Sequence, residues 1–229
     1  MIQNCQDALA INQYYGGADL FTTATADPNW PEIKNALSLG QKSSDRPDLI
    51  VRVFHAKMAA MTKDICKNGI MGRTVTHVYT IEFQKWGLPH MHMIIFFHPD
   101  SKLKSPEDVD SLISVEFPDK NTWTWAFELV KKYMVHTPCT GNPDSPCIKD
   151  LNAGCSKSFP KPFRDQTSIN EDLYSVLRRR DTGIQYEHGH HMVDNRWIVP
   201  HCKWLIWKYR CHINVEWKIR DANHPLVMT

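Results

Sequence analysis

Two histidines that are two residues apart, His90 and His92, are the first feature of this sequence with the spacing of a metal site. Residues 90–97 read as a strand, on which side chains two apart point to the same face. Two such imidazoles could hold a divalent ion, but two half-exposed histidines at a strand end are the ordinary alternative. A second His-x-His, at His188 and His190, lies among glycines without a strand pattern and is the weaker candidate.

A glutamate in the preceding segment completes the candidate site. If the chain turns through residues 85–89, an antiparallel hairpin places Gln84 opposite His90 and Glu82 opposite His92. All four side chains then project from one face. Two imidazoles and a carboxylate leave open positions on a divalent ion, which can polarise a phosphate oxygen. The alternative is a salt bridge between Glu82 and a histidine.

One histidine and three cysteines form a second set of metal-ligand types, in the Cys/His-rich subregion 136–163: His136, Cys139, Cys147 and Cys155. This stretch is rich in Pro, Gly, Asn and Asp and needs a further source of order. A structural Zn²⁺ would supply it. The alternative, three reduced thiols and a surface histidine, stays open because no Cys-x₂-Cys pair is present. The remaining cysteines read as small buried residues: Cys5, Cys66, Cys202 and Cys211.

Cations near aromatic residues are candidates for contact with nucleic acid. The cations are Lys157, Lys161, Arg164, Arg178, Arg179 and Arg180, and the polar residue Gln84 is a further candidate. Phe159 and Phe163 interleave with the first three, and stacking on unpaired bases needs such rings. The alternative is a solvated basic face. We expect Trp123, Trp125 and Trp204 to belong to the core.

The composition of the 229 residues is that of a soluble globular protein, with 42% hydrophobic and 23% charged residues. A net charge of +2 is too small to indicate a nucleic-acid partner by itself. No apolar run is long enough for a membrane span, and the first 30 residues lack a signal-peptide core. We therefore expect no membrane association, and cysteines that are reduced or bind metal.

The order of expected elements predicts an α+β fold, with an antiparallel central sheet flanked by helices. Helical spacing and capping signals predict helices at 5–16, 31–39, 48–67, 106–113 and 125–133. Alternation and β-branched residues predict strands at 20–25, 75–84, 90–97, 196–199 and 211–217.

The segment from Glu82 to His92 resembles the His-hydrophobic-His motif of HUH endonucleases, in the form found in Helitron-type rolling-circle transposases. The resemblance extends over further blocks, at residues 17–25, 29–33, 46–48, 136–139, 155–161, 178–181, 195–200 and 212–216. It implies the replication-initiator-like HUH fold with the histidines on a central strand. It also implies one domain over residues 1–229, with a Cys/His-rich insertion.

The resemblance further implies a reaction. In this family Mg²⁺ or Mn²⁺, held by the two histidines and a third ligand matching Glu82, orients a phosphate of single-stranded DNA. A tyrosine attacks that phosphate and forms a 5′-phosphotyrosine link, which leaves a free 3′-hydroxyl. The expected partner is single-stranded DNA, and a eukaryotic element would act in the nucleus. The helicase region that normally follows the domain is absent from these 229 residues.

The sequence departs from the family in three places. The paired tyrosines are expected downstream of residues 212–216, but residues 218–229 contain none. We therefore expect the nucleophile to lie beyond Thr229 and the chain to be inactive alone. Trp86 stands where the family has a basic residue, and His201-Cys202 replaces Tyr-Asn.

Three other functions compete with the nicking domain. The first is a non-catalytic remnant of a transposase that only binds single-stranded DNA. The second, a histidine-triad nucleotide hydrolase, needs a third histidine where the sequence has Ile94, and we discount it. The third is a zinc-stabilised interaction module, in which alanine at His90 and His92 would leave DNA binding unchanged.

Overall fold

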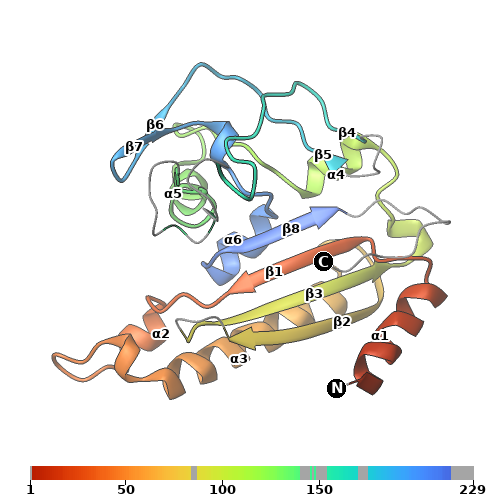
Figure 1. The fold of residues 1–229 in the computed structure, drawn as a ribbon, viewed down its shortest axis with the longest axis horizontal. Helices are drawn as coiled ribbons and strands as arrows, with labels where there is room; N and C mark the ends of the chain where they lie inside the picture. The colour runs from red at the N-terminus through yellow and green to blue at the C-terminus, as the bar shows by residue number, and fades with distance from the viewer. Residues whose placement is uncertain are drawn as a thin grey trace.

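The computed structural model describes residues 2–83, 87–139, 145, 147, 154–169 and 175–217. These residues form an α+β architecture in which helices flank an antiparallel sheet, as predicted (Figure 1). A second region of loops, short helices and small hairpins lies beyond the last strand of the sheet. Within this described part of the chain, the helices are too short or too polar to cross a membrane.

The main sheet has four strands in the order β2-β3-β1-β8, and each neighbouring pair is antiparallel. Their bounds are β1 Leu20–Thr25, β2 Thr74–Phe83, β3 Pro89–Phe97 and β8 Ile213–Trp217. The first three agree with the predicted strands to within one residue, and β8 begins two residues later than predicted. Buried and half-buried side chains alternate along β1, which is the pattern of a strand with one packed face.

The longest helix, α3 (Pro47–Cys66), packs on one face of this sheet. Proline suits its first position because the nitrogen there has no intrahelical acceptor. Its buried apolar stripe recurs at helical spacing: Ile50, Phe54, Met58, Met61 and Ile65. The same core cluster contains alternate residues of β3: Met91, Met93, Ile95 and Phe97. Full burial of one such side chain contributes about 1.5–3 kcal/mol, so this packing decides which face of β3 is inside.

The opposite face of β3 carries the two candidate histidines, because residues on a strand alternate between faces. We call it the histidine face. Helix α1 (Ile2–Tyr14) lies at its far end, where the ring of Tyr15 packs 5.6 Å from that of Phe96.

The remaining elements are short. The other helices are α2 Pro31–Lys34, α4 Pro106–Leu112, α5 Thr124–Tyr133 and α6 Lys203–Tyr209. The 3-10 turns are η1 Ser43–Asp45, η2 Pro99–Ser101 and η3 Asn195–Trp197. Two hairpins pair β4 Ser168–Ile169 with β5 Ser175–Val176, and β6 Tyr186–His188 with β7 His191–Val193.

Two expected elements differ from the structure, and one helix was not expected. The strand predicted at 196–199 is wrong, because the carboxylate of Asp194 accepts a hydrogen bond from the Arg196 amide (2.9 Å) and starts the turn η3. Helix α2 ends at Lys34 instead of residue 39. Helix α6 was not predicted, since its seven residues are too few for a helical period to stand out.

Candidate metal sites

The register of the β2–β3 hairpin decides which side chains share the histidine face. Glu82 lies opposite His90 and Thr80 opposite His92, so the predicted register is wrong by two residues. A shift of two keeps every side chain on its face, whereas a shift of one would have moved Glu82 to the α3 side. Glu82 therefore stays beside the histidines. Gln84, predicted to lie there too, is outside the described residues, as is Trp86.

Both histidine rings are held at Nδ1 by threonine hydroxyls from β1. Thr23 Oγ1 is 3.0 Å from His92 Nδ1, and Thr25 Oγ1 is 2.9 Å from His90 Nδ1. These bonds follow from the antiparallel register, which places Thr23 opposite His92 and Thr25 opposite His90. A hydrogen bond at one ring nitrogen orients the ring and leaves the other nitrogen as the candidate ligand atom.

The two Nε2 atoms have different surroundings. His92 Nε2 is 3.0 Å from Glu82 Oε1 at the edge of the site. His90 Nε2 is buried and has no hydrogen-bond partner among the described residues. Burial is also the largest cause that lowers the pKa of His90, followed by the nearby charge of His92. His90 is therefore a neutral imidazole with a free lone pair at neutral pH.

The three predicted ligands share a face without forming a closed cage. Among the described residues, one group of His, Cys, Asp or Glu has all its ligand atoms within 4.8 Å of one another, and it does not include Glu82, His90 or His92. Glu82 and His92 contact each other, whereas the Nε2 atom of His90 lies outside this contact.

Strand β8 adds polar residues that the sequence analysis missed. Asn214 lies opposite Thr23 and so shares the histidine face. Its Nδ2 donates to Glu216 Oε1 at 2.9 Å, while its buried Oδ1 has no partner. His212, just before β8, donates from Nδ1 to the carbonyl of Tyr133 at 2.8 Å. The sequence signal that could have indicated these residues is the alternation of side chains between two strand faces in the blocks 17–25 and 212–216.

A threonine-to-valine exchange tests whether β1 positions the histidines. Thr25→Val keeps the shape of the side chain but removes the partner of His90 Nδ1, so we expect affinity for Mn²⁺ to fall about tenfold. Mn²⁺ binding followed by electron paramagnetic resonance measures this, with Thr25→Ser expected to restore it. Thr76→Val, a β-branched exchange on β2 outside these contacts, is the matched control. Equal affinities for Thr25→Val and the unaltered chain would show that the hydroxyl has no positioning role.

The structure brings together the four residues of the predicted His/Cys cluster, namely His136, Cys139, Cys147 and Cys155. Their ligand atoms all lie within 4.8 Å of one another. His136 Nε2 is 3.4 Å from Cys155 Sγ and 3.7 Å from Cys147 Sγ. Metal–ligand distances of roughly 2.0–2.3 Å place tetrahedral ligands about 3.6 Å apart, so these separations fit a zinc ion at the centre. All seven cysteines are free thiols.

The electrostatics of the cluster favour a cation. Burial, aided by the neighbouring sulfurs, raises the pKa of Cys139 to about 12. Burial also acts to raise the pKa of Cys155, but the backbone N–H groups of Phe159 and Lys157 donate to its sulfur and lower the pKa overall. Three adjacent thiolates repel one another without a positive ion. The cluster could therefore hold a metal such as Zn²⁺.

The ring of His136 connects this cluster to its surroundings. It stacks on Phe159, with ring centroids 4.3 Å apart and planes inclined by 14°. Burial is the main cause that lowers the pKa of His136, and the charge of His212 is the next. His136 thus lies within electrostatic range of His212, the residue just before β8.

The predicted DNA-contact cations have different environments. Lys157 and Arg164 are exposed. Lys161 is half-buried, with its Nζ 5.4 Å from the centre of the Phe159 ring. That ring also stacks with His136 and Trp197. Phe163 lies under the guanidinium of Arg196, at 4.8 Å. Both phenylalanines therefore have partners within the fold.

The run Arg178–Arg180 is not one basic face. Arg179 is buried and donates to the carbonyls of Val115, Asn195 and Ile198, and burial lowers its pKa to about 10. This burial removes Arg179 from the DNA-contact candidates. Its neighbours form ion pairs, Arg178 with Asp110 at 3.1 Å and Arg180 with Glu116 at 2.6 Å. Contact of those two with DNA stays a prediction.

The second His-x-His forms the tip of the β6–β7 hairpin. His188 and His191 lie opposite each other, and Gly189 turns the chain at a positive φ of 59°. In the described part of the chain these histidines have no third ligand close enough for a metal site.

Comparison with known families supports the resemblance that the sequence analysis proposed. Residues 1–95 match the family model described as "Helitron helicase-like domain at N-terminus". The matched region contains β1, β2 and most of β3, and so it contains Thr23, Thr25, Glu82, His90 and His92. No curated protein matches the chain. The match confirms the resemblance to a Helitron-type domain and supports a role related to Helitron transposases.

Proposed function

We propose that this chain is the DNA-nicking domain of a Helitron-type rolling-circle transposase, with an HUH endonuclease fold. The observation that carries the proposal is the pair His90 and His92 on an interior strand, each held at Nδ1 by a threonine. In HUH endonucleases the two histidines also lie on a central strand of an antiparallel sheet. The family match over residues 1–95 supports the same assignment.

The donors on the histidine face fit a divalent ion. His90 Nε2 is buried and has no partner in the described part of the chain. His92 Nε2 lies 3.0 Å from Glu82 Oε1, and the Glu82 carboxylate supplies an oxygen. Imidazole nitrogens suit Mn²⁺ better than Mg²⁺, which takes oxygen ligands. We assign Mn²⁺ as the better fit, with Mg²⁺ as the alternative ion. His90, His92 and Glu82 would hold it, and Thr23 and Thr25 would orient the two rings.

The chain's own residues then prepare the phosphate for attack. When bound, the ion polarises a phosphate oxygen and offsets the negative charge that builds on phosphorus. Burial keeps His90 neutral, and the contact with Nε2 holds Glu82 beside His92. A tyrosine oxygen forms a bond to phosphorus, and the 3′-oxygen leaves with a proton as a free hydroxyl. In the family this tyrosine lies downstream of the block that residues 212–216 resemble, and residues 218–229 contain none. We assign the role to no tyrosine of these 229 residues.

For the His/Cys cluster we propose a structural zinc ion. Its four ligands close the tetrahedron, which leaves no open position for a substrate. The ion would join His136, which follows helix α5 along the chain, to Cys155. It would thereby order the subregion 136–163. This subregion belongs, in the proposal, to a single domain that spans residues 1–229.

The test of the proposed function is cleavage of a labelled single-stranded oligonucleotide in Mn²⁺. A longer chain that includes a downstream tyrosine-bearing helix is expected to cleave it and to retain the label as a covalent adduct, because the nucleophile is then present. The 229-residue chain is expected to bind without cleaving, and EDTA to stop the reaction. Absence of both product and adduct from the longer chain would refute the nicking function.

A second candidate function, a transposase remnant that binds single-stranded DNA without cutting it, is favoured by one observation. The ligand atoms of Glu82, His90 and His92 are not gathered within 4.8 Å. The same assay separates the two functions, because a remnant binds the oligonucleotide but forms no adduct in either length of chain. Cleavage by the 229-residue chain itself would refute the tyrosine assignment and the remnant alike.

A further inference from the structure

Four tryptophans with exposed indoles form a surface that we call the tryptophan ridge: Trp123, Trp125, Trp204 and Trp207. The ring centroids of Trp123 and Trp125 are 6.4 Å apart, those of Trp125 and Trp207 6.3 Å, and those of Trp207 and Trp204 5.5 Å, all edge to face. Their exposed fractions are 54%, 49%, 62% and 45%. The prediction that Trp123, Trp125 and Trp204 belong to the core is therefore wrong.

The ridge is not needed to fill the core. Helix α6 buries other side chains, namely Leu205, Ile206 and Tyr209. Helix α5 buries Phe127 and Val130. Large aromatic side chains that gather on a surface while their helices pack through other residues indicate an interaction site.

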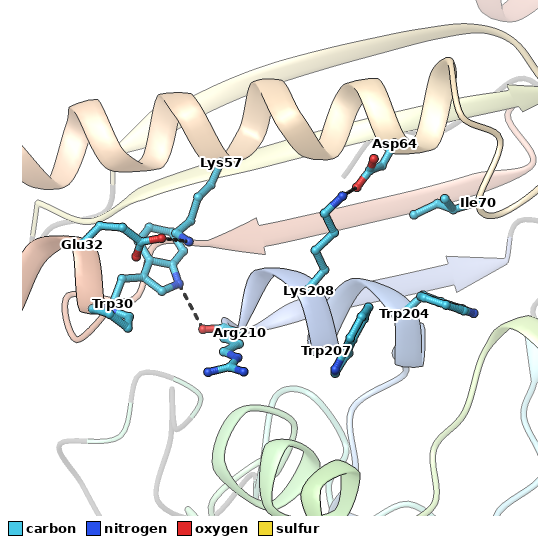
Figure 2. Close-up of a pocket in the computed structure, with 10 residues that line it drawn as sticks. Trp30, Glu32, Lys57, Asp64, Ile70, Trp204, Trp207, Lys208 and Arg210 are labelled. Atoms are coloured by element: carbon cyan, nitrogen blue, oxygen red, sulfur yellow. Dashed lines mark hydrogen bonds and ion pairs between the residues drawn. The ribbon is translucent and has the colours of Figure 1, made fainter.

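A groove of about 600 Å³ runs along the ridge between α3 and α6 (Figure 2). Trp204 and Trp207 line it from α6, and Trp30 and Ile70 add apolar surface at its two ends. Trp30 has a structural role, since it is buried and its Nε1 donates to the Tyr209 carbonyl at 2.9 Å. The two α6 indoles have no hydrogen-bond partner of this kind in the described residues.

The charged side chains of the groove leave an excess of positive charge. Lys57 pairs with Glu32 at 2.7 Å, and Lys208 pairs with Asp64 at 2.5 Å (Figure 2). Arg210, at the C-terminal end of α6, has no ion-pair partner among the described residues. Its charge is therefore available to a ligand.

A second hollow, of about 540 Å³, continues from the first and shares Arg210 with it. Lys131, Lys132 and His188 line this second hollow together with one acidic residue, Glu128. Lys132 pairs with Asp27 at 3.9 Å. The α6 segment from Lys203 to Arg210 contains three cations and no acidic residue. The two hollows thus place Arg210 and the lysines close to the indoles of Trp204 and Trp207.

We propose that the tryptophan ridge and Arg210 bind single-stranded DNA. Unpaired bases stack on aromatic side chains, and phosphates pair with cations that follow the backbone. A duplex has no free base faces to offer, so the ridge selects unpaired strands. This proposal deepens the proposed function and rests on it, because it names the surface that holds the strand before the histidine face acts.

A chain of hydrogen bonds connects the second hollow to the histidine face through the fold. Tyr133 lines the hollow, and its carbonyl accepts the hydrogen bond from His212 Nδ1. The carbonyl of His212 accepts from the Thr25 amide at 2.9 Å, and the Thr25 hydroxyl bonds to His90. Three hydrogen bonds therefore join the edge of the hollow to His90.

The test is the fluorescence anisotropy of a labelled 20-nucleotide oligothymidine titrated with the 229-residue chain. The double variant Trp204→Ala/Trp207→Ala is expected to bind at least tenfold more weakly, because stacking on both indoles is lost. Trp204→Phe/Trp207→Phe keeps aromatic faces and is expected to recover most of the affinity. Arg210→Gln is expected to weaken binding several-fold and to reduce its salt dependence by about one phosphate contact.

Tyr14→Ala, which removes an exposed aromatic outside the ridge, is the matched control and is expected to bind normally. Thermal unfolding checks that each variant is folded. Unchanged affinity in the Trp204→Ala/Trp207→Ala variant would overturn the ridge proposal and leave the nicking function standing. Tighter binding of a duplex or of oligouridine than of oligothymidine would overturn single-stranded DNA as its ligand.

Discussion

Removal of the metal from the His/Cys cluster is expected to lower the midpoint of thermal unfolding by about 10 °C. The described part of the subregion 136–163 has few regular elements, so a metal ion would be its main constraint. A ligand present at a thousand times its dissociation constant stabilises the folded state by about 4 kcal/mol. In a domain of this size, 1 kcal/mol corresponds to roughly 2–4 °C. Unfolding scans with and without a strong zinc chelator measure the difference.

Two cysteine exchanges separate the loss of metal from the loss of a thiol. Cys155→Ser removes a ligand and is expected to reproduce the effect of the chelator, with less than one zinc per chain by elemental analysis. Cys66→Ser, at a half-buried thiol outside the cluster, is the matched control and is expected to keep its zinc. A purified chain that contains no zinc, and whose unfolding midpoint does not respond to chelation, would contradict the zinc assignment.

Alanine at His90 or His92 is expected to weaken Mn²⁺ binding by at least about a hundredfold. Each exchange removes a direct ligand, and loss of a positioning partner alone typically costs tenfold or more. In a longer, tyrosine-bearing chain, cleavage of single-stranded DNA is expected to fall by roughly a thousandfold, since the ion contributes several kcal/mol to the transition state. Electron paramagnetic resonance of free Mn²⁺ and single-turnover cleavage are the two measurements.

A third histidine provides the control for this experiment. His190→Ala alters the second His-x-His, at the tip of the β6–β7 hairpin, and is expected to leave Mn²⁺ binding and cleavage unchanged. Zinc content should also be unchanged in the His90 and His92 variants, because the His/Cys cluster uses other ligands. Normal Mn²⁺ binding by His90→Ala would exclude the histidine face as the ion site, whatever the fate of cleavage.

Much of the site followed from local pattern. Alternation along a strand placed His90 and His92 on one face, and this holds in any sheet because successive side chains point to opposite sides. The same rule kept Glu82 beside them although the register was wrong by two residues. The ligand types of the His/Cys cluster were also readable from the sequence. Their assembly was not, since His136 and Cys155 are nineteen residues apart in sequence and meet only through the fold.

The sequence by itself thus determined the α+β class, the shared face of the histidines and the resemblance to a Helitron-type domain. Only the tertiary structure decided that Thr23 and Thr25 hold the two rings, because strand pairing between distant segments is set by packing rather than by local pattern. It also buried Arg179 and exposed Trp204, against the usual preference of both residue types. Burial depends on which elements cover a residue, and no local stretch of sequence contains that information.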